Sequence, residues 1–256
     1  MKNKETIYYS DELNDEFSGT SIEKREVDEN FKYKKSFVWE FCSVIIQNII
    51  SMPVKYLYAK IKFRQKFVGK EKLNQCKKSG YFIYGNHTQN FLDTFLHSLA
   101  IYPKRNFLLV NPENISLKGT GTFVEMLGAI PIPTKTSGFR NFFNQIKHRY
   151  KKRSGITIYP EAHIWPYYTK IRNFKDVSFK YPIELNAPCF AITNTYQKRK
   201  NGKPQIISYV DGPFFPDSTL GYAKDRQREL RNRIYNTMCD RAKNRNFEVI
   251  NYLRKD

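Results

Sequence analysis

Two side chains that could carry out acid–base chemistry, His87 and Asp93, lie in one short polar segment with five residues between them. A histidine can take a proton from a hydroxyl on one ring nitrogen while a carboxylate holds the other nitrogen. Such a pair needs no serine nucleophile when the substrate supplies its own hydroxyl. The chain has no Gly-x-Ser-x-Gly segment, so we expect His87 to be a general base that Asp93 orients.

Other interpretations of this segment remain open. Asp93 could pair instead with His97, its neighbour one helical turn along the chain, which would leave His87 as an ordinary loop histidine. A metal ion held by His87, Asp93 and His97 is a further alternative, although we expect no metal in this protein.

A second polar cluster follows an apolar run at residues 155–159, where Glu161 comes directly after Pro160. Its carboxylate could accept hydrogen bonds from a polyol, whereas a turn or helix-capping glutamate is the alternative. Lys170 and Arg172 follow closely and could hold a phosphate, unless they belong to a solvated basic face.

From residue 66 onward, short apolar runs alternate with helical patterns. The predicted strands cover residues 81–84, 107–110, 155–159, 189–193 and 206–210, and the predicted helices cover residues 91–102, 138–153 and 222–246. Asn201-Gly202 is a strong hairpin signal between the last two strands. The alternation predicts an α/β fold, a single layered domain with a mostly parallel central sheet flanked by helices. Because ligands bind at the carboxyl ends of such strands, we expect His87 and Glu161 at one rim of the sheet.

Composition divides the chain into three parts. Residues 1–35 alternate charged residues with Ser, Asn and Gly without an apolar period, and we expect a flexible acidic tail. Residues 36–65 include the most apolar stretch of the chain and should form an N-terminal amphipathic helical segment that associates with a membrane. Residues 66–256 should form the domain that carries His87.

The apolar stretch at residues 36–58 is interrupted by Glu40, Gln47 and Pro53, so it lacks the roughly 20 continuous apolar residues of a spanning helix. Its polar residues fall three to four positions apart and form one narrow stripe, beside Phe, Val, Trp and Ile. This pattern favours a helix lying in the bilayer interface, with Trp39 at the headgroup level. A helix packed on the protein's own core is the alternative.

The formal net charge of +20 is unevenly distributed. Residues 1–30 hold nine acidic and four basic side chains, whereas the remainder holds 15 acidic and 40 basic ones. Such a body should bind polyanions, and charge alone does not separate anionic lipid headgroups from nucleic acid. We expect an anionic membrane surface, and a nucleic-acid-binding protein is the less favoured alternative because the sequence has no recognised reader motif. Because residues 1–30 lack the apolar run of a secretory signal, we expect a peripheral or monotopic protein on the cytoplasmic face of the cell membrane.

Four segments, taken in order, resemble the glycerolipid and lysophospholipid acyltransferase family. They are Asn86-His87 with Asp93, residues 127–132 (Leu-Gly-Ala-Ile-Pro-Ile), residues 159–162 (Tyr-Pro-Glu-Ala) and residues 187–192 (Ala-Pro-Cys-Phe-Ala-Ile). They resemble the family's catalytic His/Asp block, a block that normally ends in a phosphate-binding Arg, its Phe-Pro-Glu-Gly block and its final Val-Pro-Ile-type strand. The resemblance spans about residues 66–215.

The chain departs from the family's pattern at three points. The family's usual spacing is His-x4-Asp, whereas five residues separate His87 from Asp93. The Arg expected after Ile132 is absent, and Lys135 is a nearby substitute whose ammonium lacks the bidentate fork of Arg. Ala162 replaces the Gly of the Phe-Pro-Glu-Gly block. These departures leave two alternatives, a non-phosphate acceptor and a lipid-binding protein without turnover.

The resemblance implies an O-acyltransferase of phospholipid biosynthesis. A fatty acyl group would pass from a thioester donor, acyl-CoA or acyl carrier protein, to a hydroxyl of a lysophospholipid such as 1-acyl-glycerol-3-phosphate. His87 would be the general base, with Asp93 as its partner. The substrate-binding residues would be Glu161, Lys135, Lys170 and Arg172. The resemblance implies no bound cofactor, because the thioester is a co-substrate.

Overall fold

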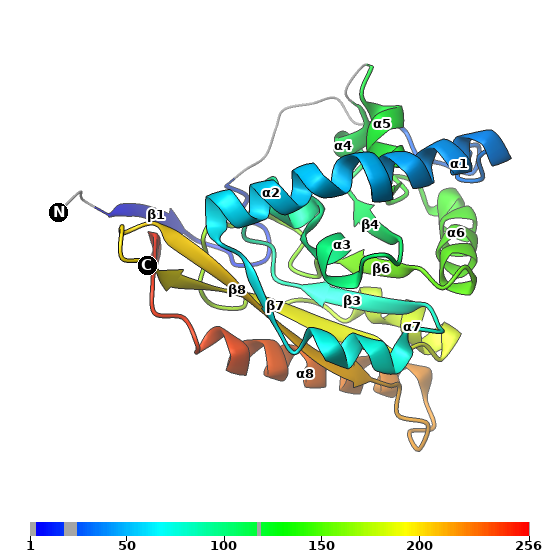
Figure 1. Ribbon diagram of the computed structural model, residues 1–256. Coiled ribbons are helices and arrows are strands. Elements are labelled where there is room, and N and C mark those ends of the chain that lie inside the picture. Colours follow the sequence, from blue (N-terminus) through cyan, green and yellow to red (C-terminus); the bar gives the residue numbers. More distant parts are fainter. Residues whose placement is uncertain (1–3, 18–24, 117–118, 256) are drawn as a thin grey trace.

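A seven-stranded sheet with the strand order β2-β8-β7-β3-β6-β4-β5 runs through the centre of the protein (Figure 1). The computed structural model describes residues 4–17, 25–116 and 119–255. The strands are β2 (Lys66–Val68), β3 (Tyr81–Gly85), β4 (Asn106–Val110), β5 (Ala129–Pro131), β6 (Gly155–Ile158), β7 (Cys189–Lys198) and β8 (Pro204–Phe214). All neighbouring strands are parallel except β7 and β8, which form an antiparallel pair. The predicted mostly parallel α/β sheet is confirmed.

The central strands owe their place to continuous apolar runs rather than to alternation. Every residue of β3 and of β6 is buried, as expected for parallel strands covered on both faces. The hairpin predicted at Asn201-Gly202 joins β7 to β8, and Gly202 has a φ of 75°, which suits a residue without a side chain.

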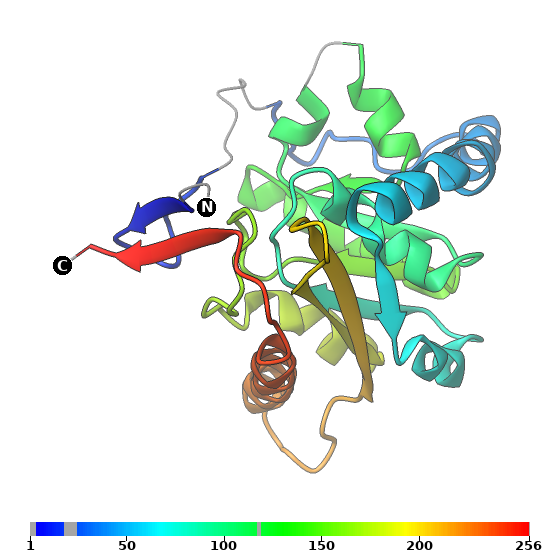
Figure 2. The ribbon, with the colours of Figure 1, turned by 60° about the vertical axis from the view of Figure 1, so that its left-hand side comes forward.

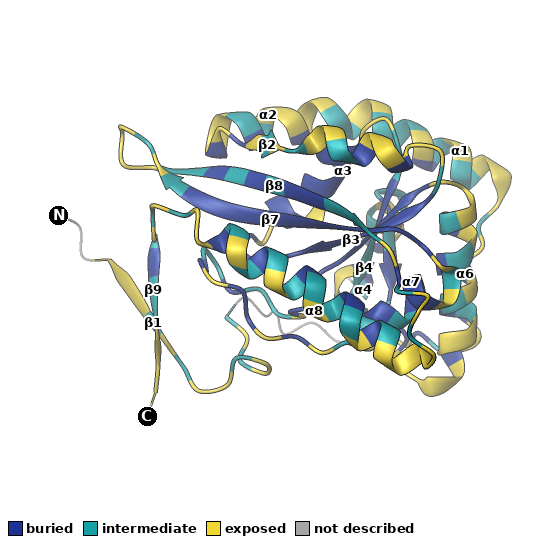
Figure 3. Ribbon diagram, turned by 90° about the horizontal axis from the view of Figure 1, so that it is seen from below, coloured by how far each residue is buried: buried dark blue, intermediate teal, exposed yellow. Residues whose placement is uncertain are grey.

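Helices cover both faces of this sheet (Figure 3). One face packs against α6 (Phe139–Lys151), α7 (Lys180–Leu185) and α8 (Ala223–Ala242). The other face packs against α3 (Leu96–Ile101), the 3₁₀ helix η2 (Lys70–Cys76) and the long N-terminal helix. The short helices are α4 (Glu113–Ser116), α5 (Gly121–Met126), η3 (Leu92–Thr94), η4 (Thr136–Gly138) and η5 (Val177–Phe179). The helix predicted over residues 91–102 is therefore split into η3 and α3.

The N-terminal helix is continuous from Phe37 to Phe63 and lies along one side of the molecule. It consists of α1 (Phe37–Ile45), a π-helical turn η1 (Ile46–Ile50) and α2 (Ser51–Phe63). The π-helical turn lies just before Pro53, because proline has no N–H to donate and its ring crowds the preceding turn. Ser36 caps the start of the helix by accepting the N–H of Trp39.

The polar stripe of this helix faces the protein. Ser43 and Gln47 are buried, and Ser43 donates to the carbonyl of Met126 at 2.7 Å. Gln47 donates to the carbonyl of Leu127 at 3.1 Å, and Arg105 donates to Glu40, Ser43 and Gln47. Polar bonds therefore hold the first half of the helix to the domain, whereas Ala59 and Phe63 near its end are buried in an apolar cluster with residues of α3.

The apolar residues of the helix face outward instead. Phe37 is 86% exposed and Ile61 is 75% exposed, and Val38, Phe41, Ile49, Ile50, Val54, Tyr56 and Leu57 are exposed as well. A contiguous apolar surface of this kind marks a membrane or protein interface. The segment Phe37–Phe63 is also long and apolar enough to cross a membrane, judged by length and composition alone.

The described part of residues 1–35 is packed rather than free, which corrects the expectation of a flexible tail. Strand β1 (Glu5–Tyr9) pairs in parallel with β9 (Ile250–Arg254), as Figure 2 shows beside the main body. Val27 is fully buried, and Tyr33 donates to the carbonyl of Pro131 at 2.8 Å. Scattered aromatic and β-branched residues in this acidic segment find apolar partners on the domain, so the segment is anchored. Residues 1–3 and 18–24 lie outside the described residues.

Candidate active site

The candidate site begins where β3 ends at the carboxyl rim of the sheet. Gly85 is its last residue, and Asn86 and His87 follow. A Cβ on Gly85 would lie 2.5 Å from the ring of His97 and 2.9 Å from that of Tyr159, so only glycine fits there. Close packing of backbone and rings thus fixes the place at which the chain leaves the strand.

His87 and Asp93 meet directly, with 3.0 Å between Nδ1 of His87 and Oδ2 of Asp93. The same carboxylate oxygen accepts the backbone N–H groups of Thr88 and Gln89 at 2.7 and 2.8 Å. The five intervening residues form a tight loop around this oxygen, and this loop accommodates the longer spacing. The alternative contact between Asp93 and His97 is not formed.

The imidazole of His87 is set up to accept a proton. A carboxylate can only accept hydrogen bonds, so Nδ1 carries the proton and Nε2 presents a free lone pair. No described residue donates to Nε2, and the side chain is 16% exposed while that of Asp93 is fully buried. The ring stacks on Tyr159 at 4.2 Å between centroids, and the hydroxyl of Tyr159 donates to the carbonyl of Asp93 at 2.6 Å. An imidazole held in this way could take a proton from a hydroxyl placed beside Nε2.

Glu161 holds the loop that carries His87 through backbone hydrogen bonds. Its Oε2 accepts the backbone N–H of His87 at 3.0 Å, and its Oε1 accepts the backbone N–H of Arg172 at 2.9 Å. The side chains of Glu161 and Arg172 also form an ion pair at 3.5 Å, and both are almost completely buried. Burial raises the pKa of Glu161, and Arg172 and the two N–H groups oppose that rise. The predicted proximity to His87 is present, but the carboxylate holds protein groups.

Arg172 is likewise committed to the protein. Its guanidinium donates to the carbonyls of Glu12 and His163 and lies 4.8 Å from the ring centroid of Trp165. With no exposed surface, it is inaccessible to a phosphate group in this structure. The predicted phosphate contact of Arg172 would need a rearrangement of this loop.

The two remaining predicted cations lie at the surface. Lys135 follows β5, which is three strands from β3, or roughly 14 Å at the usual strand spacing. Its ammonium pairs with Glu26. Lys170 is exposed and has no described acidic partner. The structure thus groups His87, Asp93, Glu161 and Arg172 and leaves Lys135 apart.

Strand β7 contributes residues that sequence reasoning missed. Asn194 exchanges two hydrogen bonds with Asn86, at 3.0 and 2.8 Å, and approaches Asp93 at 3.5 Å. Tyr196 donates to the hydroxyl of Thr88 at 2.8 Å. The polar run Thr-Asn-Thr that directly follows the apolar start of β7 was the available signal, because buried polar side chains require partners.

His97 is a second, different histidine behind the site. It is buried, its Nδ1 lies 3.2 Å from the hydroxyl of Thr157, and its ring packs on Tyr159. Burial lowers its pKa to about 3, so it is neutral at physiological pH. Within the described residues, no group of three or more His, Cys, Asp and Glu side chains could hold a metal ion.

Comparison with solved structures relates this fold to that of an acyltransferase. It is similar to the crystal structure of the 1-acyl-sn-glycerophosphate (LPA) acyltransferase PlsC from Thermotoga maritima, with a TM-score of 0.54 and 12% identity. The match covers 85% of this chain and 86% of that chain, and at this identity it is a likeness of fold alone. The sequence matches no protein-family model, and no curated protein matches it.

Proposed function

We propose that this protein is an O-acyltransferase that moves a fatty acyl group from a thioester donor to a hydroxyl of a lysophospholipid such as 1-acyl-glycerol-3-phosphate. The observation that carries the proposal is the contact of 3.0 Å between His87 and Asp93, which leaves Nε2 of His87 open at the carboxyl rim of the sheet. The likeness of fold to a solved 1-acyl-sn-glycerophosphate acyltransferase supports it.

In the proposed reaction, Nε2 of His87 removes the proton of the acceptor hydroxyl as its oxygen attacks the thioester carbonyl. Asp93 stabilises the imidazolium that forms. The tetrahedral intermediate then collapses, the carbon–sulfur bond breaks, and the imidazolium returns its proton to the departing thiolate. The products are the ester and a free thiol, so the base is regenerated. The donor is acyl-CoA or acyl carrier protein, and no bound cofactor takes part.

The supporting residues have separate roles in this proposal. Glu161 and Arg172 hold the loop that presents His87, since their side chains bind protein groups. Lys170 is exposed and has no described acidic partner, and it is proposed to meet the acceptor phosphate. Lys135 would serve the same headgroup only after release from Glu26.

The outward apolar face of the N-terminal helix supports attachment to a membrane, and the protein is proposed to be monotopic or peripheral on the cytoplasmic face of the cell membrane. Lysophospholipids are dissolved in that membrane, so attachment would bring the rim of the sheet to its substrate. The proposed partners are accordingly an anionic membrane surface, a lysolipid acceptor and an acyl thioester.

The test is transferase activity of His87→Ala in neutral detergent, with lysophosphatidate and acyl-CoA or acyl carrier protein as substrates. Loss of a positioned base should lower kcat by about a hundred- to ten-thousand-fold. Asn90→Ala, at an exposed position in the same loop, is the matched control and should retain the parent rate. Parent-like turnover by His87→Ala would remove His87 as the base.

The burial of Arg172 and the pairing of Lys135 favour a second candidate, acyl transfer to an uncharged alcohol. Parallel assays with lysophosphatidate and with monoacylglycerol separate the two. A kcat/KM that is higher for monoacylglycerol would support the second candidate.

A further inference from the structure

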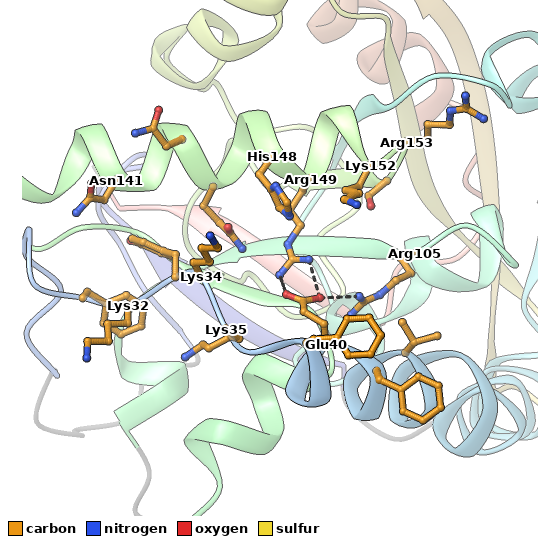
Figure 4. A pocket seen from close by; sticks show the side chains of 18 of the residues that line it. Lys32, Lys34, Lys35, Glu40, Arg105, Asn141, His148, Arg149, Lys152 and Arg153 are labelled. Atoms are coloured by element: carbon orange, nitrogen blue, oxygen red, sulfur yellow. Dashed lines mark hydrogen bonds and ion pairs between the residues drawn. The ribbon is translucent and has the colours of Figure 1, made fainter.

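A cavity lies away from His87, between the start of the N-terminal helix and α6 (Figure 4). Its volume is about 990 Å³. The chain segment 31–35, α1, α6 and the loops that lead into β4 and β6 supply its walls. The cavity is large enough to hold the headgroup of a lipid.

The walls of this cavity are strongly basic. The cations that line it are Lys32, Lys34, Lys35, Lys104, Arg105, Arg149, Lys152 and Arg153. Among the lining residues Glu40 is the one acid, and it is already bound by Arg105 at 3.1 Å and by Arg149 at 2.8 Å, as the dashed lines of Figure 4 show. The cavity therefore keeps a large excess of positive charge.

Four of these cations are exposed and lack an acidic partner in the part of the chain that the structure describes. They are Lys32, Lys34, Lys152 and Arg153. Lys35 pairs with Glu125, and three backbone carbonyls bind the ammonium of Lys104. Like charges gathered without partners repel one another, so an anion placed among them would be bound favourably.

The same cavity has an apolar wall. Phe37, Phe41 and Val44 of α1 line it and are 86%, 59% and 37% exposed. They continue into the outward apolar face of the helix. A ligand that fits both walls is amphiphilic, with an anionic group among the lysines and hydrocarbon along α1.

The cavity lies at the amino ends of the parallel strands, whereas His87 lies at their carboxyl ends. Lys104 and Arg105 precede β4 and Arg153 precedes β6, whereas His87 follows β3. Strands β3 and β6 run in parallel, so the two sites are separated by the length of the strand, roughly 13 Å for five residues. A ligand held in the cavity would therefore leave the catalytic histidine free.

We propose that this cavity binds the phosphate-bearing headgroup of an anionic bilayer phospholipid, whose acyl chains lie along Phe37, Phe41 and Val44. This inference rests on the membrane attachment in the proposed function and adds a defined headgroup site to it. The apolar wall distinguishes a lipid from RNA, which would use the basic wall alone. Bound lipid would fix the helix against α6 at the membrane surface.

The test is sedimentation of the full chain with vesicles of pure phosphatidylcholine and with an equal mixture of phosphatidylcholine and phosphatidylglycerol. The variant K32Q/K34Q/K152Q removes three unpaired cations of the cavity. Each lysine near an anionic surface contributes about fivefold to partitioning, so the variant should bind mixed vesicles about a hundredfold more weakly. Binding to pure phosphatidylcholine should stay at the parent level.

A matched control removes the same charge elsewhere. Lys200, Lys203 and Arg228 are exposed on the β7–β8 hairpin and on α8, and K200Q/K203Q/R228Q should bind mixed vesicles much as the parent does. Equal losses in both triple variants would show diffuse attraction and overturn the headgroup site. Weaker RNA binding by K32Q/K34Q/K152Q with unchanged vesicle binding would overturn it as well.

Two further measurements are needed. The first distinguishes a phospholipid from free phosphate as the ligand of the cavity, and the second tests the headgroup site independently of the proposed function. Short-chain phosphatidylglycerol, added below its micelle concentration, should protect the parent protein against unfolding by urea if the ligand is a lipid. Equal protection by inorganic phosphate would refute the proposal that the cavity binds an amphiphilic ligand. The triple variant should keep parent transferase activity in neutral detergent. One outcome is that the unsubstituted protein binds mixed vesicles through these lysines and yet transfers no acyl group. That outcome would refute the proposed function while supporting the headgroup site.

Discussion

Replacement of Glu161 by Gln distinguishes a residue that positions His87 from one that binds the acceptor. The amide keeps the shape of the carboxylate but leaves one of two backbone N–H groups without an acceptor, and it removes the charge opposite Arg172. Breaking a buried ion pair costs about 3–5 kcal/mol. Arg172 retains the carbonyls of Glu12 and His163, so we expect the lower end, about 3 kcal/mol.

Urea unfolding, followed by the fluorescence of the buried Trp165, measures this loss. Glu184→Gln, at an exposed position on α7 without a described ion pair, is the control and should change the free energy of unfolding by less than about 0.5 kcal/mol. In the transferase assay, Glu161→Gln should lower kcat while KM for the acceptor stays within about twofold of the parent value. Unchanged stability and kcat together with a raised acceptor KM would refute the reasoning, because the carboxylate would then bind substrate.

Asp93→Asn should lower kcat by about a hundred- to ten-thousand-fold, because a neutral amide stabilises neither the imidazolium nor the required tautomer; a pH profile of kcat identical to that of the parent would contradict this role. His97 is neutral in the folded protein because burial lowers its pKa to about 3, whereas the unfolded chain takes up a proton below its usual value of 6.5. Stability from this group is therefore complete above pH 6.5 and declines as the pH falls towards 3, by about 2 kcal/mol at pH 5. His97→Gln should lose this part of the pH dependence in urea unfolding, and an unchanged difference between pH 7 and pH 5 would refute it.

The sheet could be predicted because its central strands are apolar without interruption, as in β3 and β6. The packing of residues 25–35 on the domain could not be predicted, because few side chains of this segment enter the core. Val27 is one of them, and the many charged residues around it leave no apolar pattern in the sequence. The helix predicted over residues 91–102 is split at Phe95, whose φ of −140° lies outside the helical region. The apolar pattern of residues 91–102 continues across this position and does not mark the break.

The residue types of the site and the strands that carry them could be predicted from the sequence. Which of these side chains are exposed to solvent could not. Strands ending next to each other bring His87 and Glu161 together, as the α/β pattern indicates. Whether Arg172 points to solvent or to Trp165 depends on loop packing, which charge clusters do not encode. Likewise, helical periodicity locates the stripe of Glu40 and Gln47 but does not say which side meets the domain.

The inward polar face of the N-terminal helix has a consequence for the protein in water. Arg105 and the carbonyls of Met126 and Leu127 prevent the helix from rotating, so Phe37 and Ile61 cannot fold inward when lipid is removed. Molecules purified without detergent should therefore hide these side chains against one another and elute as dimers or larger assemblies that a mild detergent dissolves.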